Sequence, residues 1–363
     1  MLDSLDPHQT TQQSGLHTDW MQWADTQARQ RLLVACFIFD NHQSLYHEQK
    51  RSEVHLEETV SLLSAPCQDE DDLWNAPTAV EWQAKSVDSN AQHLSHIEQD
   101  ISSRCVISQS PFAQTFDICS LASRLPPRED PTYPSNFFPH SIDSVVLSLG
   151  TRYSNSPLAC SYLALHHTPL HDLLAIAGDT WVFGKKITPP SAFHSAQARL
   201  KVWSASLAAA AATQHACHII STLLQPQPKE VSGVSDYWAF YTAALICWAF
   251  GHRYQPSSSG PNGTLTASTP LTAVDGSMDI DSPLTASADE AELRAITYIN
   301  GMLELDTEDL LTSKASMRGD TVGIIDAVRS RLELENVGGK CMMIVDAILV
   351  LTRIKEGGRG KWF

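Results

Sequence analysis

The side chains of this chain that could do chemistry include one short run of acids. Asp69, Glu70, Asp71 and Asp72 are consecutive. Closely spaced carboxylates are ligands that magnesium prefers, so the run raises the question of a magnesium-diphosphate site. It lies between two prolines, and no second segment supplies the Asn or Asp, Ser or Thr, and Glu needed to complete such a site. We therefore expect a solvated acidic turn and no bound metal.

Two groups of histidines could also offer metal ligands. The first is His166, His167 and His171, and the second is His215 and His218 with Cys217. A structural zinc site needs about four ligands from converging segments, and neither group is accompanied by a second ligand pair. Pro169 also interrupts the helix that would place His167 and His171 on one face. We expect both groups to be unligated, the second on a partly exposed helix face.

The remaining nucleophiles do not form a recognisable catalytic site. The eight cysteines are scattered singly without a CxxC pair, which is typical of reduced, mostly buried thiols in the cytosol or nucleus. The chain has no GxSxG elbow and no glycine-rich phosphate loop. The sequence therefore predicts a protein that is not an enzyme and that holds no cofactor.

Composition and charge restrict the class of protein further. Hydrophobic residues make up 43% of the 363 residues, enough to build a core. The formal net charge is −16, which would repel a phosphate backbone, so this chain is not expected to bind DNA by itself. No secretion signal precedes the first helix, and no apolar run approaches the roughly 20 residues that span a bilayer. We expect a protein that is not in a membrane.

Apolar spacing predicts an all-α fold with many helices. The alanine-rich stretch at 204–216 favours helix strongly. No segment is typical of a sheet. Helices are expected over 18–47, 52–63, 110–122, 142–150, 157–178, 192–224, 237–252 and from about 289 to the C-terminal tail, with a break at Gly338 and Gly339.

The same reading predicts the domain organisation. Residues 1–17 are expected to be a disordered polar leader, and residues 18–252 one large helical domain. Residues 253–288 are rich in Ser, Thr, Pro and Gly with few large apolar side chains, so we expect a disordered acidic insertion. Residues 289–363 are expected to supply further helices that pack on the same domain.

Two stretches carry a more specific pattern. RLLVACFIFD begins with Arg31 and Leu32 and continues with Phe37 and Asp40 as F-x-x-D. This helix is apolar all round in its middle, which predicts that it is packed on several sides. The second stretch, LLSAPCQDEDDLWNAPTAVEW, is expected to be a structured loop that buries a large aromatic side chain against that helix. Its marker residues are Pro66, Cys67, Leu73, Trp74, Pro77 and Trp82.

In this order the two stretches resemble the fungal-specific transcription factor domain of zinc-finger regulators, both the two-cysteine, two-histidine type and the binuclear cluster type. The closing VDAILVLTRIKEGGRGKWF resembles the end of the same proteins. The resemblance implies an all-helical regulatory domain in the nucleus, with protein partners such as a second copy or a related chain. In that family, zinc and DNA are bound by an N-terminal finger module, whose cysteine patterns are missing from this chain.

Two alternatives stay open from the sequence. One is an all-helical, magnesium-dependent enzyme of the isoprenoid-synthase type that uses the acidic run. The other is a pure helical scaffold that acts as a dominant-negative dimerisation partner of a full-length regulator. The expected function remains a transcription regulator of RNA polymerase II genes whose helical domain mediates interactions.

Overall fold

The structure of the chain is a computed structural model. Helices account for 88% of the residues that it describes, so the fold is all-α as predicted. The chain divides into two compact units, residues 1–128 with 135–154, and residues 129–134 with 155–363. The range 18–252, which the sequence predicted as one helical domain, is thus shared between these two units. The residues described are 7–47, 68–87, 111–125, 139–178, 181–182, 185–186, 190–225, 234–251, 288–312, 321–335 and 341–356.

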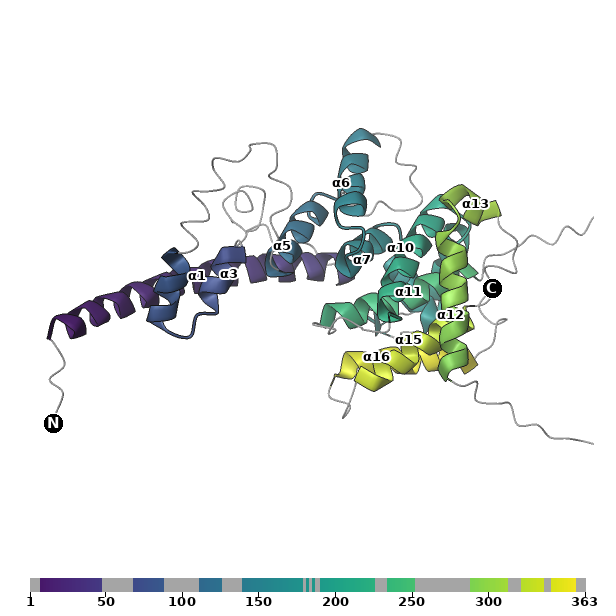
Figure 1. Cartoon of the computed structure of the whole chain (residues 1–363). Coiled ribbons are helices and arrows are strands. Elements are labelled where there is room, and N and C mark those ends of the chain that lie inside the picture. The colour runs from purple at the N-terminus through teal and green to yellow at the C-terminus, as the bar shows by residue number, and fades with distance from the viewer. Residues whose placement is uncertain are drawn as a thin grey trace, which may run out of the picture. The chain divides into compact units, whose positions relative to one another are not determined.

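The first unit is built on one long helix, α1 (Pro7–His47), which is continuous in Figure 1. It begins eleven residues before the predicted start at 18, so residues 7–17 are helical and the disordered leader expected there is wrong over this range. Proline is well accommodated at a helix start, and the residues that follow contain no strong breaker. The predicted helix at 52–63 lies outside the described residues.

Three shorter helical segments accompany α1 in this unit. They are α3 (Gln68–Trp74), a helical stretch at 79–87, and α5 (Pro111–Ala122), which is where apolar spacing predicted it. A fourth helix, α6 (Pro139–Arg152), packs on α5. The two are joined by the Tyr153 hydroxyl, which donates to a carboxylate oxygen of Asp117 over 3.3 Å.

The second unit begins with four helices that correspond to two longer predicted ones. They are α7 (Pro157–His166), α8 (Leu170–Ala177), α9 (Pro190–Trp203) and α10 (Leu207–Leu223). Pro169 separates the first pair, as its ring requires. The second pair is separated because Ser206 caps α10: its hydroxyl accepts a hydrogen bond from the backbone N–H of Ala209 over 3.3 Å. Two-residue strands β1 (Trp181–Val182) and β2 (Lys185–Lys186) pair antiparallel between α8 and α9, which the sequence did not predict.

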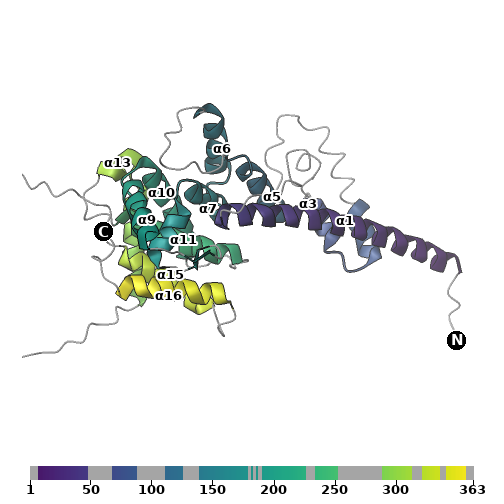
Figure 2. The ribbon, with the colours of Figure 1, turned by 180° about the vertical axis from the view of Figure 1, so that it is seen from behind.

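The core of this unit is α11 (Val234–Gly251), in which every residue from 239 to 250 is buried. Helix α10 packs against it through an alanine-rich face that allows close approach. The C-terminal helices are α12 (Ala288–Leu303), α13 (Thr307–Thr312), α15 (Val322–Glu335) and α16 (Met342–Glu356). Figures 1 and 2 show α10, α11, α15 and α16 following one another in this order.

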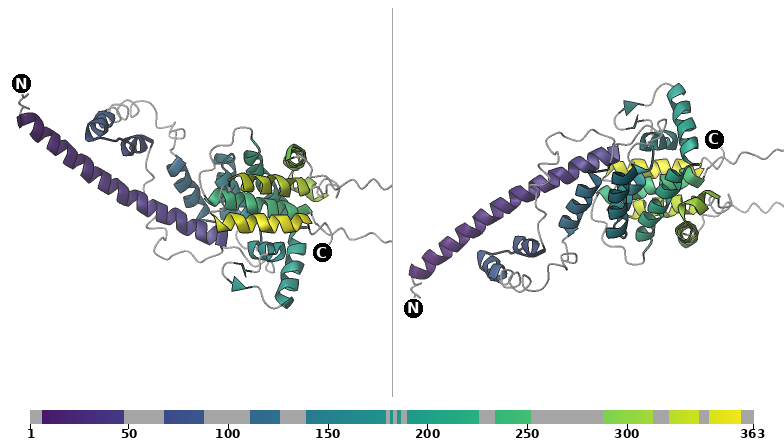
Figure 3. Two further views of the ribbon diagram at one scale, coloured as in Figure 1. Left: turned by 90° about the horizontal axis from the view of Figure 1, so that it is seen from below. Right: turned by 90° about the horizontal axis from the view of Figure 1, so that it is seen from above.

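The C-terminal helices complete this core. Helices α11, α15 and α16 lie side by side in Figure 3, and α12 packs on both α10 and α15. The amide nitrogen of the Gln214 side chain also donates to the carbonyl of Leu305 over 2.6 Å, which ties α10 to the turn after α12. The Ser, Thr, Pro and Gly-rich stretch expected to be disordered lies outside the described residues, apart from its last residue, which opens α12.

The contact between α12 and α15 depends on a glycine. A Cβ atom at Gly323 would lie 2.7 Å from the Arg294 Cβ, 3.1 Å from the Ala295 nitrogen and 3.2 Å from the Ala291 carbonyl oxygen. Two of these three neighbours are backbone atoms, which cannot move aside without displacing α12. Any side chain at position 323 must therefore push the two helices apart.

We predict that Gly323→Ala destabilises the protein by about 1–3 kcal/mol, because overpacking outweighs the gain in helix propensity. Urea unfolding followed by circular dichroism measures the loss. Gly15→Ala on α1 is the matched control, since a Cβ there meets nothing within 4 Å and should raise stability slightly. Equal effects of the two substitutions would contradict the packing argument.

Candidate functional site

The two stretches singled out in the sequence meet at Arg31. Its guanidinium donates to a carboxylate oxygen of Asp71 on α3, and both side chains are about 15% exposed. The guanidinium carbon also lies 4.9 Å from the centre of the Trp74 ring and 5.8 Å from that of Phe112. An arginine with a carboxylate on one side and aromatic faces on the others is held by both ion pairing and cation–π attraction.

The acidic run therefore differs from the turn that we expected. Asp71 and Asp72 lie in helix α3, because the ten residues between Pro66 and Pro77 are enough for two helical turns. The Asp71 carboxylate is already paired with Arg31 and the Asp72 side chain is exposed, with its backbone carbonyl accepting from the Lys85 ammonium over 3.0 Å. In the part of the chain that the structure describes, no group of three or more His, Cys, Asp or Glu side chains could hold a metal ion.

Aromatic contacts join the same segments. Phe37, which is 2% exposed, packs edge-on against Phe116 of α5 with ring centres 5.5 Å apart. Trp82 packs against Trp23 of α1 at 5.7 Å. The expectation that this stretch buries a large aromatic side chain against α1 is met only in part, since Trp74 stays 40% exposed while its ring covers Arg31.

The other marker residues are less well buried. Leu73 and Asp40 are half-buried and Pro77 is exposed. Leu32 is 64% exposed, so the prediction that the helix at 31–40 is covered on several sides is wrong. Pro66 and Cys67 lie outside the described residues. Phe112, which completes the surroundings of Arg31, was not singled out, and no local signal links it to a residue about 80 positions earlier.

We predict that Arg31→Met destabilises the protein by about 3 kcal/mol, near the lower bound for breaking a buried ion pair. The loss arises because the Asp71 carboxylate keeps its burial without its partner. Chemical denaturation of Arg31→Met, Asp71→Asn and the double variant gives the coupling energy. Arg294→Ala is the control, since Arg294 pairs with Glu290 on an exposed surface of α12 and should have little effect. A coupling energy near zero would contradict the predicted role of Arg31.

The histidines meet in the second unit. His167, at the end of α7, lies parallel to His215 of α10 with ring centres 6.3 Å apart and 5° between the planes. The indole N–H of Trp203 donates to the His167 carbonyl over 2.7 Å, which fixes the backbone there. Burial, and to a lesser degree the neighbouring rings of His167 and His218, lower the pKa of His215 to about 4. Burial also lowers the pKa of His167, so both stacked rings are neutral at pH 7.

We predict that this arrangement makes the fold sensitive to acid. Because the pKa of His215 is lower in the folded state than its ordinary 6.5, the unfolded chain binds the proton first. Stability should be complete above about pH 6.5 and fall towards pH 4, by on the order of 3 kcal/mol for this residue. Unfolding measured from pH 4.5 to 7.5 should show a smaller slope for His215→Gln.

His218→Gln is the comparison for that measurement. Burial also lowers the pKa of His218, but its side chain is exposed, so the variant should remove less of the slope. Identical slopes for the wild type and His215→Gln would contradict the assignment.

Cys217, next to these histidines, is fully buried, so the expectation of a partly exposed face is wrong at this position. Burial, followed by the hydrogen bond with Cys247 of α11, raises the pKa of the Cys217 thiol well above its ordinary value. A protonated, inaccessible thiol is a poor nucleophile and a poor metal ligand. These two cysteines belong to the packing between α10 and α11.

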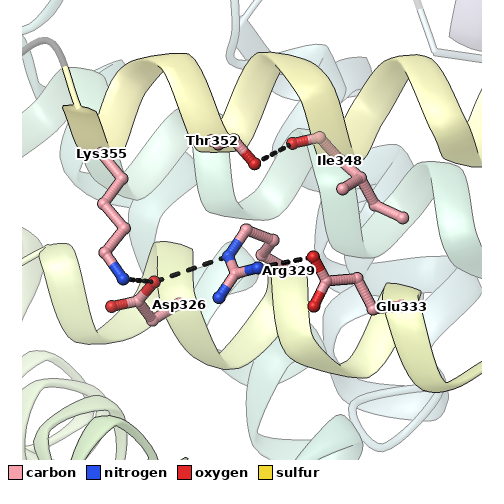
Figure 4. A network of polar contacts seen from close by, with 6 residues as sticks. All are labelled: Asp326, Arg329, Glu333, Ile348, Thr352 and Lys355. Carbon is pink, nitrogen blue, oxygen red and sulfur yellow. Dashed lines mark hydrogen bonds and ion pairs between the residues drawn. The ribbon is translucent and has the colours of Figure 1, made fainter. Parts of the chain in front are cut away.

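Two further polar clusters link neighbouring helices. Arg199 of α9 binds the buried Asp172 of α8 with two hydrogen bonds of 2.8 and 2.6 Å. In Figure 4 the Lys355 ammonium lies 2.9 Å and the Arg329 Nε 3.7 Å from the same oxygen of Asp326. Each carboxylate is neutralised by a cation, so both clusters hold neighbouring helices together.

Searches against family models, curated proteins and solved structures found no match. Among the described helices none is both long enough and apolar enough to cross a bilayer.

Proposed function

We propose that this chain is a helical regulatory and interaction domain of a nuclear transcription regulator, with DNA recognition supplied by a zinc-finger segment that is not in this chain. One observation carries the proposal: the two stretches on which the resemblance depends are in contact. Arg31 of the first binds Asp71 of the second and stacks on Trp74. Two stretches of one domain are expected to pack together.

The charge of the chain supports the same proposal. A net charge of −16 disfavours binding to a phosphate backbone, whereas it is compatible with binding other proteins. The polar clusters of the described residues link neighbouring helices, as expected for a domain that acts through its surface. In the proposed role the fold presents surfaces to protein partners.

The enzyme alternative is less well supported. Magnesium binding by the acidic run would need carboxylates free to coordinate, and Asp71 is held by Arg31. Prenyl diphosphate incubated with the chain and magnesium should release no pyrophosphate above background. Release that is lost in Asp69→Ala/Asp72→Ala would favour the enzyme over the regulator.

The regulatory role can be tested by tethering. We expect the chain, fused to an unrelated DNA-binding domain in a fungal cell, to change the transcription of a reporter at least several-fold relative to that domain alone. Arg31→Met should reduce the change because it loosens the contact between the two stretches, whereas Arg294→Ala should preserve it. Matched protein levels are checked by immunoblot, and reporter output that never differs from the DNA-binding domain alone would refute the proposal.

A further inference from the structure

An exposed row of residues on α1 has the spacing of a helix-pairing seam. Met21, Asp25, Ala28, Leu32, Ala35 and Phe39 are all exposed and follow one another at alternating intervals of four and three residues. Met21 is 52% exposed, and Leu32 and Phe39 are each 64% exposed. Leu33 and Cys36, beside this row, are exposed as well. We call the six residues of the row, from Met21 to Phe39, the α1 seam.

The α1 seam lies on the opposite side of the helix from the contacts within the first unit. Those contacts are made by Trp23, Arg31 and Phe37, which face the helical stretch at 79–87, α3 and α5. Five of the six seam residues are apolar, and soluble proteins rarely leave such a row in water without a partner. An interval of 3.5 residues on average is the repeat by which two helices stay in contact along their length.

We infer that the α1 seam pairs with the α1 seam of a second copy of this chain, with the two helices antiparallel. The seam has two lines of residues. One holds Asp25, Leu32 and Phe39, and the other holds Met21, Ala28 and Ala35. In an antiparallel pair each line faces the other, so Leu32 meets Ala28 and Phe39 meets Met21 of the second copy. Large residues then face smaller ones, which gives evenly packed layers.

A parallel pair would be less favourable. It would place each residue against its own equivalent, which brings Asp25 against Asp25 and leaves two layers of paired alanines beside a layer of paired phenylalanines. In the antiparallel pair Asp25 faces Ala35, and Arg29 of its own helix neutralises it at 2.8 Å. The preference for an antiparallel pair follows from these side-chain sizes and charges.

The properties of the seam also fit a second copy as the occupant. A two-fold axis requires one surface to contain both halves of the interaction, and the α1 seam contains both the large line and the small line. Between Met21 and Phe39 the charged residues are Asp25, Arg29 and Arg31, and each is paired within its own chain. The seam is thus nearly neutral although the chain carries −16, so two copies can meet there with little charge repulsion.

Sedimentation equilibrium of the full chain tests the inference. We expect the wild type to be a dimer, and Leu32→Glu to raise its dissociation constant by about 100-fold or more, since two carboxylates would be buried in each interface. Leu147→Glu on α6 is the matched control, because Leu147 is 65% exposed and lies off the seam. Far-UV circular dichroism checks that helix content is retained. A monomeric wild type, or a dimer that Leu32→Glu does not weaken, would overturn the inference.

A charge exchange tests the orientation. Met21→Glu and Phe39→Lys should each weaken the dimer, whereas the double variant should associate more tightly than either, because the new carboxylate at position 21 faces the new ammonium at position 39. In a parallel pair the double variant would place like charges together and would be the weakest of the three. That result would overturn the antiparallel arrangement.

The dimer does not depend on the proposed regulatory role. If the chain is a dimer but has no effect on the tethered reporter, the regulatory role is refuted and the pairing of the α1 seams stands. If the chain is a monomer that still changes reporter transcription, the pairing is refuted and the regulatory role stands.

Discussion

The structure depends on the requirement that an apolar helix be covered. Helix α11 is apolar on every side and is buried from residue 239 to residue 250 because α7, α8, α10, α15 and α16 pack around it. The small residues of α10 favour close packing on α11, and the glycine at 323 allows a close approach between α12 and α15. The second unit is therefore a set of helices arranged around one buried helix.

The first unit meets the same requirement on one side only. Helix α1 has an apolar run over residues 32–39 that resembles the composition of α11, yet its covered side holds Phe37 and its other side exposes Leu32 and Phe39. The covered side is fixed by Arg31, which joins α3 to α1 through Asp71 and Trp74. The exposed side is the basis for the proposed pairing of two copies, and the covered side is the basis for the proposed function.

Much of the helical framework was predictable from residue order. Helix α5 follows the apolar spacing, and Pro169 marks the end of one helix and the start of the next. The acidic stretch was wrongly predicted as a loop because prolines at both ends are typical of loops, although the intervening residues have no reason to avoid a helix. The break before α10 was missed because serine caps a helix only where the chain already bends, and serine alone does not announce the bend.

The sequence by itself determined that the chain is helical, which helices are strongly apolar, and that Arg31 and the stretch around Trp74 are distinctive. Only the tertiary structure decided that Arg31 pairs with Asp71, forty residues away, that His167 stacks on His215, and that one side of α1 stays exposed. Helix propensity and apolar periodicity are local and can be read along the chain. Burial and ion pairing depend on which distant elements come together, and residue order does not specify that locally.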